Sequence, residues 1–262
     1  MHRFAYIFNH HFLFVPLVFL VFSCDDILRD NPLDPKNPNS YRPTTISIEA
    51  FVNTQNDDAF NQYMLSALSI IEQRYPGKVA IAHYHRNVGD TYPDSLAIPA
   101  NEILYTQYVN NFDGQKGVPD VFINGVAKRI KGASSAETAL ERLDNALQPM
   151  LVENSFYTIE PEVTKSGSKL IVSVVIARLG SELAEDILVR AILVDKRASE
   201  PGSPVVKQIE ISNLIPSIEP GEQREIQFSD FYLIPGADLS MLFMISSSEN
   251  YLVEQAIEVG VP

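Results

Sequence analysis

The sequence predicts an α/β region followed by an all-β sandwich. Between residues 46 and 150, short apolar runs alternate with segments whose apolar residues recur every three or four positions, as strands alternating with helices do. From residue 155 onward, apolar and polar residues alternate in short runs that are separated by glycine and proline. A length of 262 residues with 45% hydrophobic and 20% charged residues fits one large domain or two small ones. This composition excludes a collagen-like or mainly disordered chain.

The charge balance limits the possible partners. Lysine and arginine number 20 against 33 aspartates and glutamates, which gives a formal net charge of −13. Binding to a phosphate backbone favours the opposite sign, so we expect no nucleic-acid partner. The sequence shows no Ser-His-Asp spacing, no phosphate-binding glycine loop and no His-Glu-x-x-His motif. We therefore expect a protein that is not an enzyme and has no cofactor, with an enzyme of unrecognised type as an alternative.

The first 24 residues read as an export signal. An apolar run of roughly 12 residues ends in Leu-Val-Phe-Ser-Cys at positions 20–24, and a membrane-spanning helix needs about 20. Small Ser23 before Cys24 resembles the lipobox of bacterial lipoproteins. The resemblance implies that residues 1–23 are removed and that Cys24 is acylated, which anchors the protein to a bacterial membrane. We expect the cell envelope, with the outer membrane favoured over the inner; an ordinary secretory signal is the alternative.

Cysteine usage supports the lipoprotein interpretation, because Cys24 is the only cysteine and no intrachain disulfide can form. Residues 24–45 that follow are rich in proline and poor in apolar residues. Such a segment is semi-extended at about 3.1 Å per residue, so it could hold a folded body up to roughly 60 Å from the bilayer. We expect it to act as a tether.

The region 46–150 is expected to run strand, helix, strand, helix, strand, strand, helix. The first strand, helix and second strand form a βαβ unit, which is normally parallel. Asp57 and Asp58 can cap the first helix, and an Asn124-Gly125 turn suits a two-residue hairpin. The sequence Ser134-Ser135-Ala136-Glu137 matches a capping box for the last helix. The expected elements are strand 46–52, helix 59–75, strand 78–85, helix 99–108, strands 120–123 and 126–130, and a final helix carrying Leu140, Leu143 and Leu147.

Four pieces of this region carry a resemblance: IEAFVNT, a strand ending AHYH, GVPDVFING and the terminal helix. They resemble the thioredoxin-like domain of Omp28-type outer-membrane lipoproteins. In that family the loop after the first strand carries Cys-x-x-Cys, whereas here Asn56 and Ala59 occupy the two cysteine positions with Asp57 and Asp58 between them. Thiol-disulfide exchange requires a thiolate, which an amide and a methyl group do not provide. The resemblance therefore implies a redox-dead thioredoxin-like domain.

The same resemblance points to a peptide-binding edge. Pro119 matches the cis-proline of the family, which lies against the loop after the first strand. In the active family, extended peptides pair with the backbone that precedes this proline. The resemblance thus implies a possible peptide-binding groove at Phe60, Val118 and Pro119, with an envelope protein or peptide as partner. The alternative is a turn proline with a purely structural role.

Two histidines allow a different function. His83 and His85 stand at positions i and i+2 of an expected strand and so share one of its faces. Together with Asp57 and Asp58 they could bind zinc or copper. A metal-binding or metal-delivering envelope protein is therefore an alternative function. The competing interpretation is that these are core histidines whose hydrogen bonds are satisfied.

Seven β-rich runs follow between residues 155 and 262. They are separated by Ser-Gly-Ser, Glu-Pro-Gly and Ile-Pro-Gly clusters, and the run after residue 169 alternates on one face. Seven short strands with regular turns predict an immunoglobulin-like or fibronectin-III-like sandwich. The chain has no tryptophan, so the antibody-type core is excluded. This half also resembles the C-terminal β domain of Omp28-like proteins. The runs are 156–164, 169–179, 185–195, 205–211, 224–228, 241–247 and 254–259.

Overall fold

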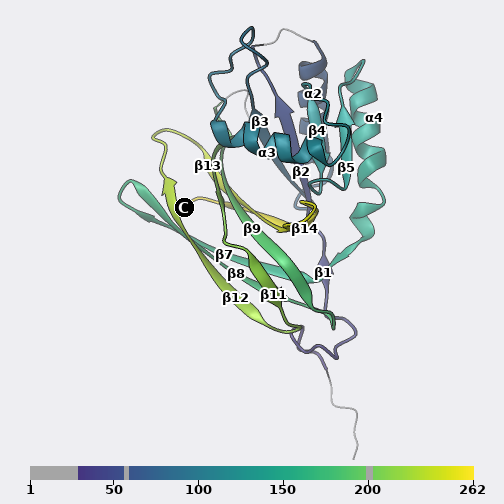
Figure 1. Cartoon of the computed structure of the whole chain (residues 1–262), viewed down its shortest axis with the longest axis vertical. Coiled ribbons are helices and arrows are strands. Elements are labelled where there is room, and N and C mark those ends of the chain that lie inside the picture. Colours follow the sequence, from purple (N-terminus) through teal and green to yellow (C-terminus); the bar gives the residue numbers. More distant parts are fainter. Residues whose placement is uncertain (1–28, 56–58, 199–202) are drawn as a thin grey trace, which may run out of the picture.

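The computed structural model describes residues 29–55, 59–198 and 203–262. The protein is a mixed α and β structure with more strand than helix, and its long helices lie at one end of the longest axis (Figure 1). The described chain begins at the opposite end, at Arg29. The predicted order, an α/β region before an all-β region, is confirmed.

The α/β region contains a four-strand stretch of sheet in the order β3-β2-β4-β5. β2 and β3 are parallel, as the βαβ prediction requires, while β4 is antiparallel to β2 and β5 to β4. Helices α2 and α4 pack in one apolar core, and α3 packs in another with residues of the opposite sheet face. The elements are β2 (Ile46–Val52), α2 (Ala59–Arg74), β3 (Val79–His85), α3 (Pro99–Asn110), β4 (Asp120–Ile123), β5 (Lys128–Lys131) and α4 (Ala136–Leu147).

The second region is built from two packed sheets. β12, β8 and β7 form one sheet, and β14, β13, β9 and β10 follow one another in the other, with β11 paired to β9. Apolar side chains of both sheets share one core. The seven predicted runs are all strands, and the short β11 was not predicted. The strands are β7 (Tyr157–Ser166), β8 (Lys169–Arg178), β9 (Ala184–Asp195), β10 (Val205–Ile211), β11 (Ile215–Ile218), β12 (Gln223–Tyr232), β13 (Leu239–Ser247) and β14 (Val253–Gly260).

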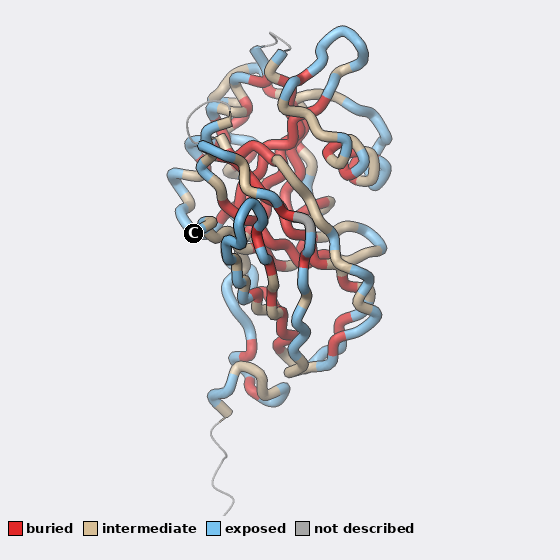
Figure 2. Tube along the Cα trace, turned by 90° about the vertical axis from the view of Figure 1, so that its left-hand side faces the viewer, coloured by how far each residue is buried: buried red, intermediate tan, exposed pale blue. Residues whose placement is uncertain are grey.

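The two regions share a sheet and a core. β10 pairs in parallel with β3 through Val205 and His83, which makes one nine-stranded sheet. On the α3 side, a core of apolar and tyrosine side chains contains residues of both regions. Figure 2 shows the buried segments running from one region into the other without an exposed boundary. The residues 46–150 and 155–262 are thus continuous in the fold, and whether they are separate domains stays a prediction.

A buried ion pair lies where the regions meet. Glu49 of β2 accepts a hydrogen bond from Arg190 of β9 at 3.0 Å, and both side chains are at most 5% exposed. The hydroxyls of Tyr84 and Tyr108 donate to the same carboxylate at 2.6 and 2.7 Å. Burial, followed by the Glu49 charge, raises the pKa of Tyr84, so its hydroxyl stays protonated as a donor. The carboxylate is therefore fully hydrogen-bonded inside the protein.

The expectation of an extended tether over residues 24–45 is wrong for its described part. Residues 31–40 form three consecutive turns, in which Asp34, Asn37 and Ser40 each donate a backbone hydrogen bond to the residue three positions earlier. Asn31, Asp34 and Asn37 each start a turn, and their side chains accept from the backbone two residues on. A proline follows each of them and presets the next backbone angle. This repeat of Asn or Asp with proline therefore folds locally.

The turn segment also packs against the sandwich. The N–H of Gly180 donates to the hydroxyl of Ser40 at 2.8 Å. A Cβ on Gly221 would lie 2.4 Å from the carbonyl oxygen of Leu33, so the two backbones touch there. β1 (Arg42–Pro43) then pairs with β6 (Asn154–Ser155). Residues 24–28 lie outside the described residues.

Two local turn predictions are also corrected. The loop between β4 and β5 has four residues, 124–127, instead of the predicted two. Asn124 does not pair with β5, because its side chain accepts a hydrogen bond from the N–H of Ser47 and its carbonyl accepts one from the N–H of Val253. The cap of α4 is Ser135, whose hydroxyl accepts from the N–H of Thr138, so the expected box with Glu137 is displaced by one residue.

Candidate functional site

The Val118-Pro119 corner lies between α3 and β4. Its peptide bond is cis, as the family resemblance implied. Pro119 is buried and Val118 is half-buried. Among the described residues, the N–H and C=O of Val118 have no hydrogen-bond partner. The corner thus presents one residue whose backbone can accept and donate.

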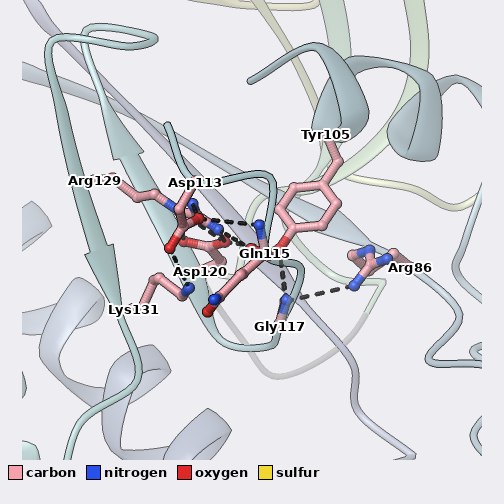
Figure 3. Close-up of polar contacts among 8 residues, drawn as sticks. All are labelled: Arg86, Tyr105, Asp113, Gln115, Gly117, Asp120, Arg129 and Lys131. Carbon is pink, nitrogen blue, oxygen red and sulfur yellow. Dashed lines mark hydrogen bonds and ion pairs between the residues drawn. The ribbon is translucent and has the colours of Figure 1, made fainter. Parts of the chain in front are cut away.

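A buried ion pair holds the strand that leaves this corner. Asp120 is fully buried, and its carboxylate lies 2.6 Å from Nη2 of Arg129 on β5. The hydroxyl of Tyr105 on α3 donates to the same carboxylate at 2.7 Å. Figure 3 shows these side chains converging from α3, β4 and β5. The first residue after Pro119 is therefore fixed by two neighbouring elements.

The residue before Val118 is held as firmly. The N–H of Gly117 donates to the Tyr105 hydroxyl oxygen at 2.8 Å, and its carbonyl lies 3.5 Å from Nη1 of Arg86. The Arg86 guanidinium stacks over the Tyr105 ring, 4.2 Å from its centroid, and pairs with Glu102 at 2.9 Å. Burial and then Asp120 raise the pKa of Tyr105, which keeps its proton. Both flanks of Val118 are thus rigidly placed.

Charged side chains line the outer rim of the corner. Arg129 and Lys131 both reach Asp113, at 2.7 and 3.3 Å, and Arg129 also donates to the carbonyl of Gln115. Figure 3 shows this group beside Gly117. These contacts tie the loop that carries Asp113 and Gln115 to β5.

The two predicted histidines each form a hydrogen bond through Nδ1. His85 contacts Asp94 at 3.0 Å, and both side chains are buried. Burial alone would raise the pKa of Asp94, but hydrogen bonds from His85 and from the N–H groups of Thr54 and Leu96 outweigh it and lower the pKa to about 2. His83 contacts Ser203 at 2.6 Å. Burial, followed by the nearby His85, lowers the pKa of His83 to about 3, so it is neutral at pH 7.

A complete metal site does not form among the described residues, where no group of three His, Cys, Asp or Glu side chains is placed to hold an ion. Each histidine uses one ring nitrogen for a hydrogen bond, and the buried Nε2 of His83 has no partner in the described part of the chain. Asp57 and Asp58, the other predicted ligands, lie outside the described residues. Of the four predicted metal ligands, the structure describes only His83 and His85, and the metal site stays a prediction.

The degenerate redox positions are described only in part. Asn56 lies outside the described residues, while Ala59 is the exposed first residue of α2. Phe60 follows it and is 45% exposed. The groove predicted between Phe60 and Val118 therefore stays a prediction, whereas the Val118 side of it is defined. Cys24 also lies outside the described residues.

Sequence reasoning missed the side chains that hold the corner: Tyr105, Asp120, Arg129 and Arg86. One signal was present, since Asp120 opens an otherwise apolar strand and is followed by the basic strand KRIK. A buried carboxylate needs a cationic or donor partner, and the paired strand supplies one. Tyr105 and Arg86 gave no comparable signal.

No protein-family model and no curated protein matches the chain. Among solved structures, HBP35 of Porphyromonas gingivalis is similar with a TM-score of 0.59 at 12% identity, covering 84% of this chain and 76% of that one. Protein AGR_C_4864 from Agrobacterium tumefaciens is similar with a TM-score of 0.53 at 17% identity, covering 84% and 96%. These likenesses show the fold alone.

A domain of the outer membrane lipoprotein Omp28 from Porphyromonas gingivalis covers 41% of this chain and 88% of its own, at 10% identity and a TM-score of 0.31. A likeness of that size carries no argument about function. Within the described residues, none of the helices has both the length and the apolar character needed to cross a bilayer.

Proposed function

We propose that the protein is a cell-envelope lipoprotein, anchored through acylated Cys24, that binds an extended peptide or protein segment at the Val118 corner without catalysing a reaction. In this proposal residues 46–150 are a thioredoxin-like domain without its redox pair, and residues 155–262 are an immunoglobulin-like sandwich. The strand order β3-β2-β4-β5 and the helices on both sheet faces support the first assignment. The two packed sheets support the second.

The observation that carries the binding proposal is the backbone of Val118, whose N–H and C=O have no hydrogen-bond partner among the described residues and which lies between two fixed neighbours. Gly117 and Asp120 are held by Tyr105, Arg86 and Arg129, so the Val118 N–H and C=O are presented in one orientation. An extended segment can satisfy both groups by adding one backbone pair. Because the corner is preorganised, little conformational entropy is lost there on binding.

The binding test uses peptides selected from a random displayed library against the purified protein. Val118→Asp places a carboxylate where the peptide backbone packs, and we expect the dissociation constant to rise at least about tenfold, since an unpaired buried charge is costly. Lys207→Glu on the sandwich is the control, at matched ionic strength. If only Lys207→Glu weakens binding, the corner is not the binding site.

Redox inactivity is tested separately, by insulin reduction, where we expect no turnover above buffer. Asn56→Cys combined with Ala59→Cys should then form a disulfide if the loop keeps the family spacing. Two thiols that stay reduced under oxidising conditions would contradict the assignment of these positions. The metal alternative is tested by zinc titration calorimetry on the wild type and His83→Asn, where loss of a stoichiometric site in the variant would favour it.

A further inference from the structure

The end of the molecule at which the described chain begins exposes an unusual group of apolar side chains. Tyr41, Phe156 and Leu183 are 37%, 44% and 45% exposed. The Phe156 ring packs against Gly180, whose N–H donates to Ser40, the residue before Tyr41, and Leu183 follows Gly180 by three positions in the chain. Three separate chain segments, around residues 40, 156 and 183, therefore contribute to one surface, which we call the turn-segment end.

The exposed apolar side chains of the turn-segment end are held in place by folded structure. Residues 35–40 and 178–182 face each other across a hollow of about 320 Å³, which Phe156 lines in part. The guanidinium of the buried Arg178 lies 5.7 Å from the centre of the Phe156 ring. The Asx-Pro turns and the contact between Leu33 and Gly221 keep the segment in place.

Charges of both signs lie at this end. Lys36 and Arg42 are exposed and form no ion pair with a described residue, Asp30 and Glu182 are exposed too, and Arg29 pairs with Asp34. The chain as a whole carries a formal charge of −13. A mixed-charge rim around aromatic and aliphatic side chains suits the headgroup layer of a zwitterionic bilayer, where tyrosine side chains are favoured.

The position of the anchor makes the same end the one nearest the membrane. Four residues lie between Cys24 and Arg29, and the five chain steps from one to the other span at most about 18 Å. The described chain begins at the end of the longest axis that lies opposite to α3 (Figure 1). An acylated Cys24 would therefore hold this end, and no other, within reach of the headgroups.

We propose that the turn-segment end rests on the bilayer surface, with Tyr41, Phe156 and Leu183 in contact with the headgroup layer. This proposal rests on the proposed lipid anchor at Cys24. It places the α/β region, which carries the Val118 corner, on the side away from the membrane (Figure 1). The occupant of the exposed apolar surface is thus a lipid bilayer.

The absence of tryptophan allows a direct test. The full-length lipidated protein is reconstituted in phosphatidylethanolamine–phosphatidylcholine vesicles with and without brominated acyl chains, as single-tryptophan variants. Phe156→Trp reports on the turn-segment end, with Leu183→Trp as a second reporter should the first fail to fold. Ile103→Trp on α3, where the native side chain is 63% exposed, reports on the opposite end. Co-sedimentation with vesicles is measured for each variant.

We expect brominated lipid to quench at least about half of the Phe156→Trp emission and to leave Ile103→Trp unchanged, because only the first would lie at the interface. Co-sedimentation without quenching of either reporter at the turn-segment end would overturn the proposed orientation and leave the anchor intact. Equal quenching at both ends, or quenching of Ile103→Trp alone, would also overturn it. If neither variant co-sediments, the anchor itself is wrong and the proposed function fails with it.

Discussion

Acid should destabilise the protein through His83. This side chain is 4% exposed, and burial, followed by the nearby His85, lowers its pKa from 6.5 to about 3. Between these two values the unfolded chain binds a proton that the folded chain does not, so the free energy of unfolding must fall as the pH decreases. Above about pH 6.5 both states are neutral at this position and the effect vanishes.

The magnitude follows from the pKa difference. Each pH unit below 6.5 lowers the free energy of unfolding by about 1.4 kcal/mol, so the loss between pH 7 and pH 4 is about 3 kcal/mol. Total stabilities are about 5–15 kcal/mol, which makes this a large share. Asp94, whose pKa is lowered to about 2, adds its own loss only below about pH 4. The two groups therefore act in separate pH windows.

The assay is urea unfolding at several pH values between 7 and 4, for the wild type and His83→Asn. Asparagine does not ionise, and its amide oxygen can replace Nδ1 as the partner of Ser203. Burial raises the pKa of Glu72 and Glu254, which act in the opposite direction in both proteins and cancel in the comparison. We expect the wild type to lose about 3 kcal/mol more than the variant over this range. Equal losses would refute the reasoning.

Three further predictions use matched variants. Gly125→Ala should lower the free energy of unfolding by about 2 kcal/mol more than Gly132→Ala, as measured by urea titration. Both glycines have a positive φ, but only at Gly125 would a Cβ lie 2.0 Å from a backbone oxygen, that of Tyr251. Gly221→Ala should expose residues 29–41 to limited proteolysis, whereas Gly236→Ala, with a similar φ and open space, should not; equal cleavage would contradict the packing of that segment. Cys24→Ser should release the protein from membranes and abolish fatty-acid labelling; a variant that stays bound and labelled excludes the anchor.

Periodicity was sufficient to predict most elements. The spacing of apolar residues in α2 and the alternation along β8 each reflect one buried face, and the short apolar run of β2 reflects a strand that is buried on both faces. β11 was missed because it has four residues and contains a proline. The Asx-Pro turns were mistaken for a tether, although the three-residue repeat of Asn or Asp before proline was visible. The tether prediction relied on the proline-rich composition and overlooked that each Asn-Pro or Asp-Pro pair favours a turn.

The pairing of β10 with β3, which connects the two regions, could not be predicted from the sequence. The parallel pairing of β10 with β3 brings together residues 122 positions apart in the chain, Val205 and His83, and nothing in either strand specifies the other. A charged residue inside each of two buried strands, Glu49 and Arg190, was the available signal. Two such residues of opposite sign suggest a pair but do not establish which strands are neighbours.

The Glu49–Arg190 pair bears on how the two ends of the molecule act together. Separating the α/β region from the sandwich would break this ion pair and leave Glu49 with only its two tyrosine donors, and removing one member of such a buried pair costs about 3–5 kcal/mol. Continuous sheet pairing and the shared tyrosine-rich core oppose the same separation. The Val118 corner and the turn-segment end therefore belong to one folded unit. If the turn-segment end rests on the bilayer, a ligand bound at Val118 is held at a set height above the membrane, and the distance is determined by the fold.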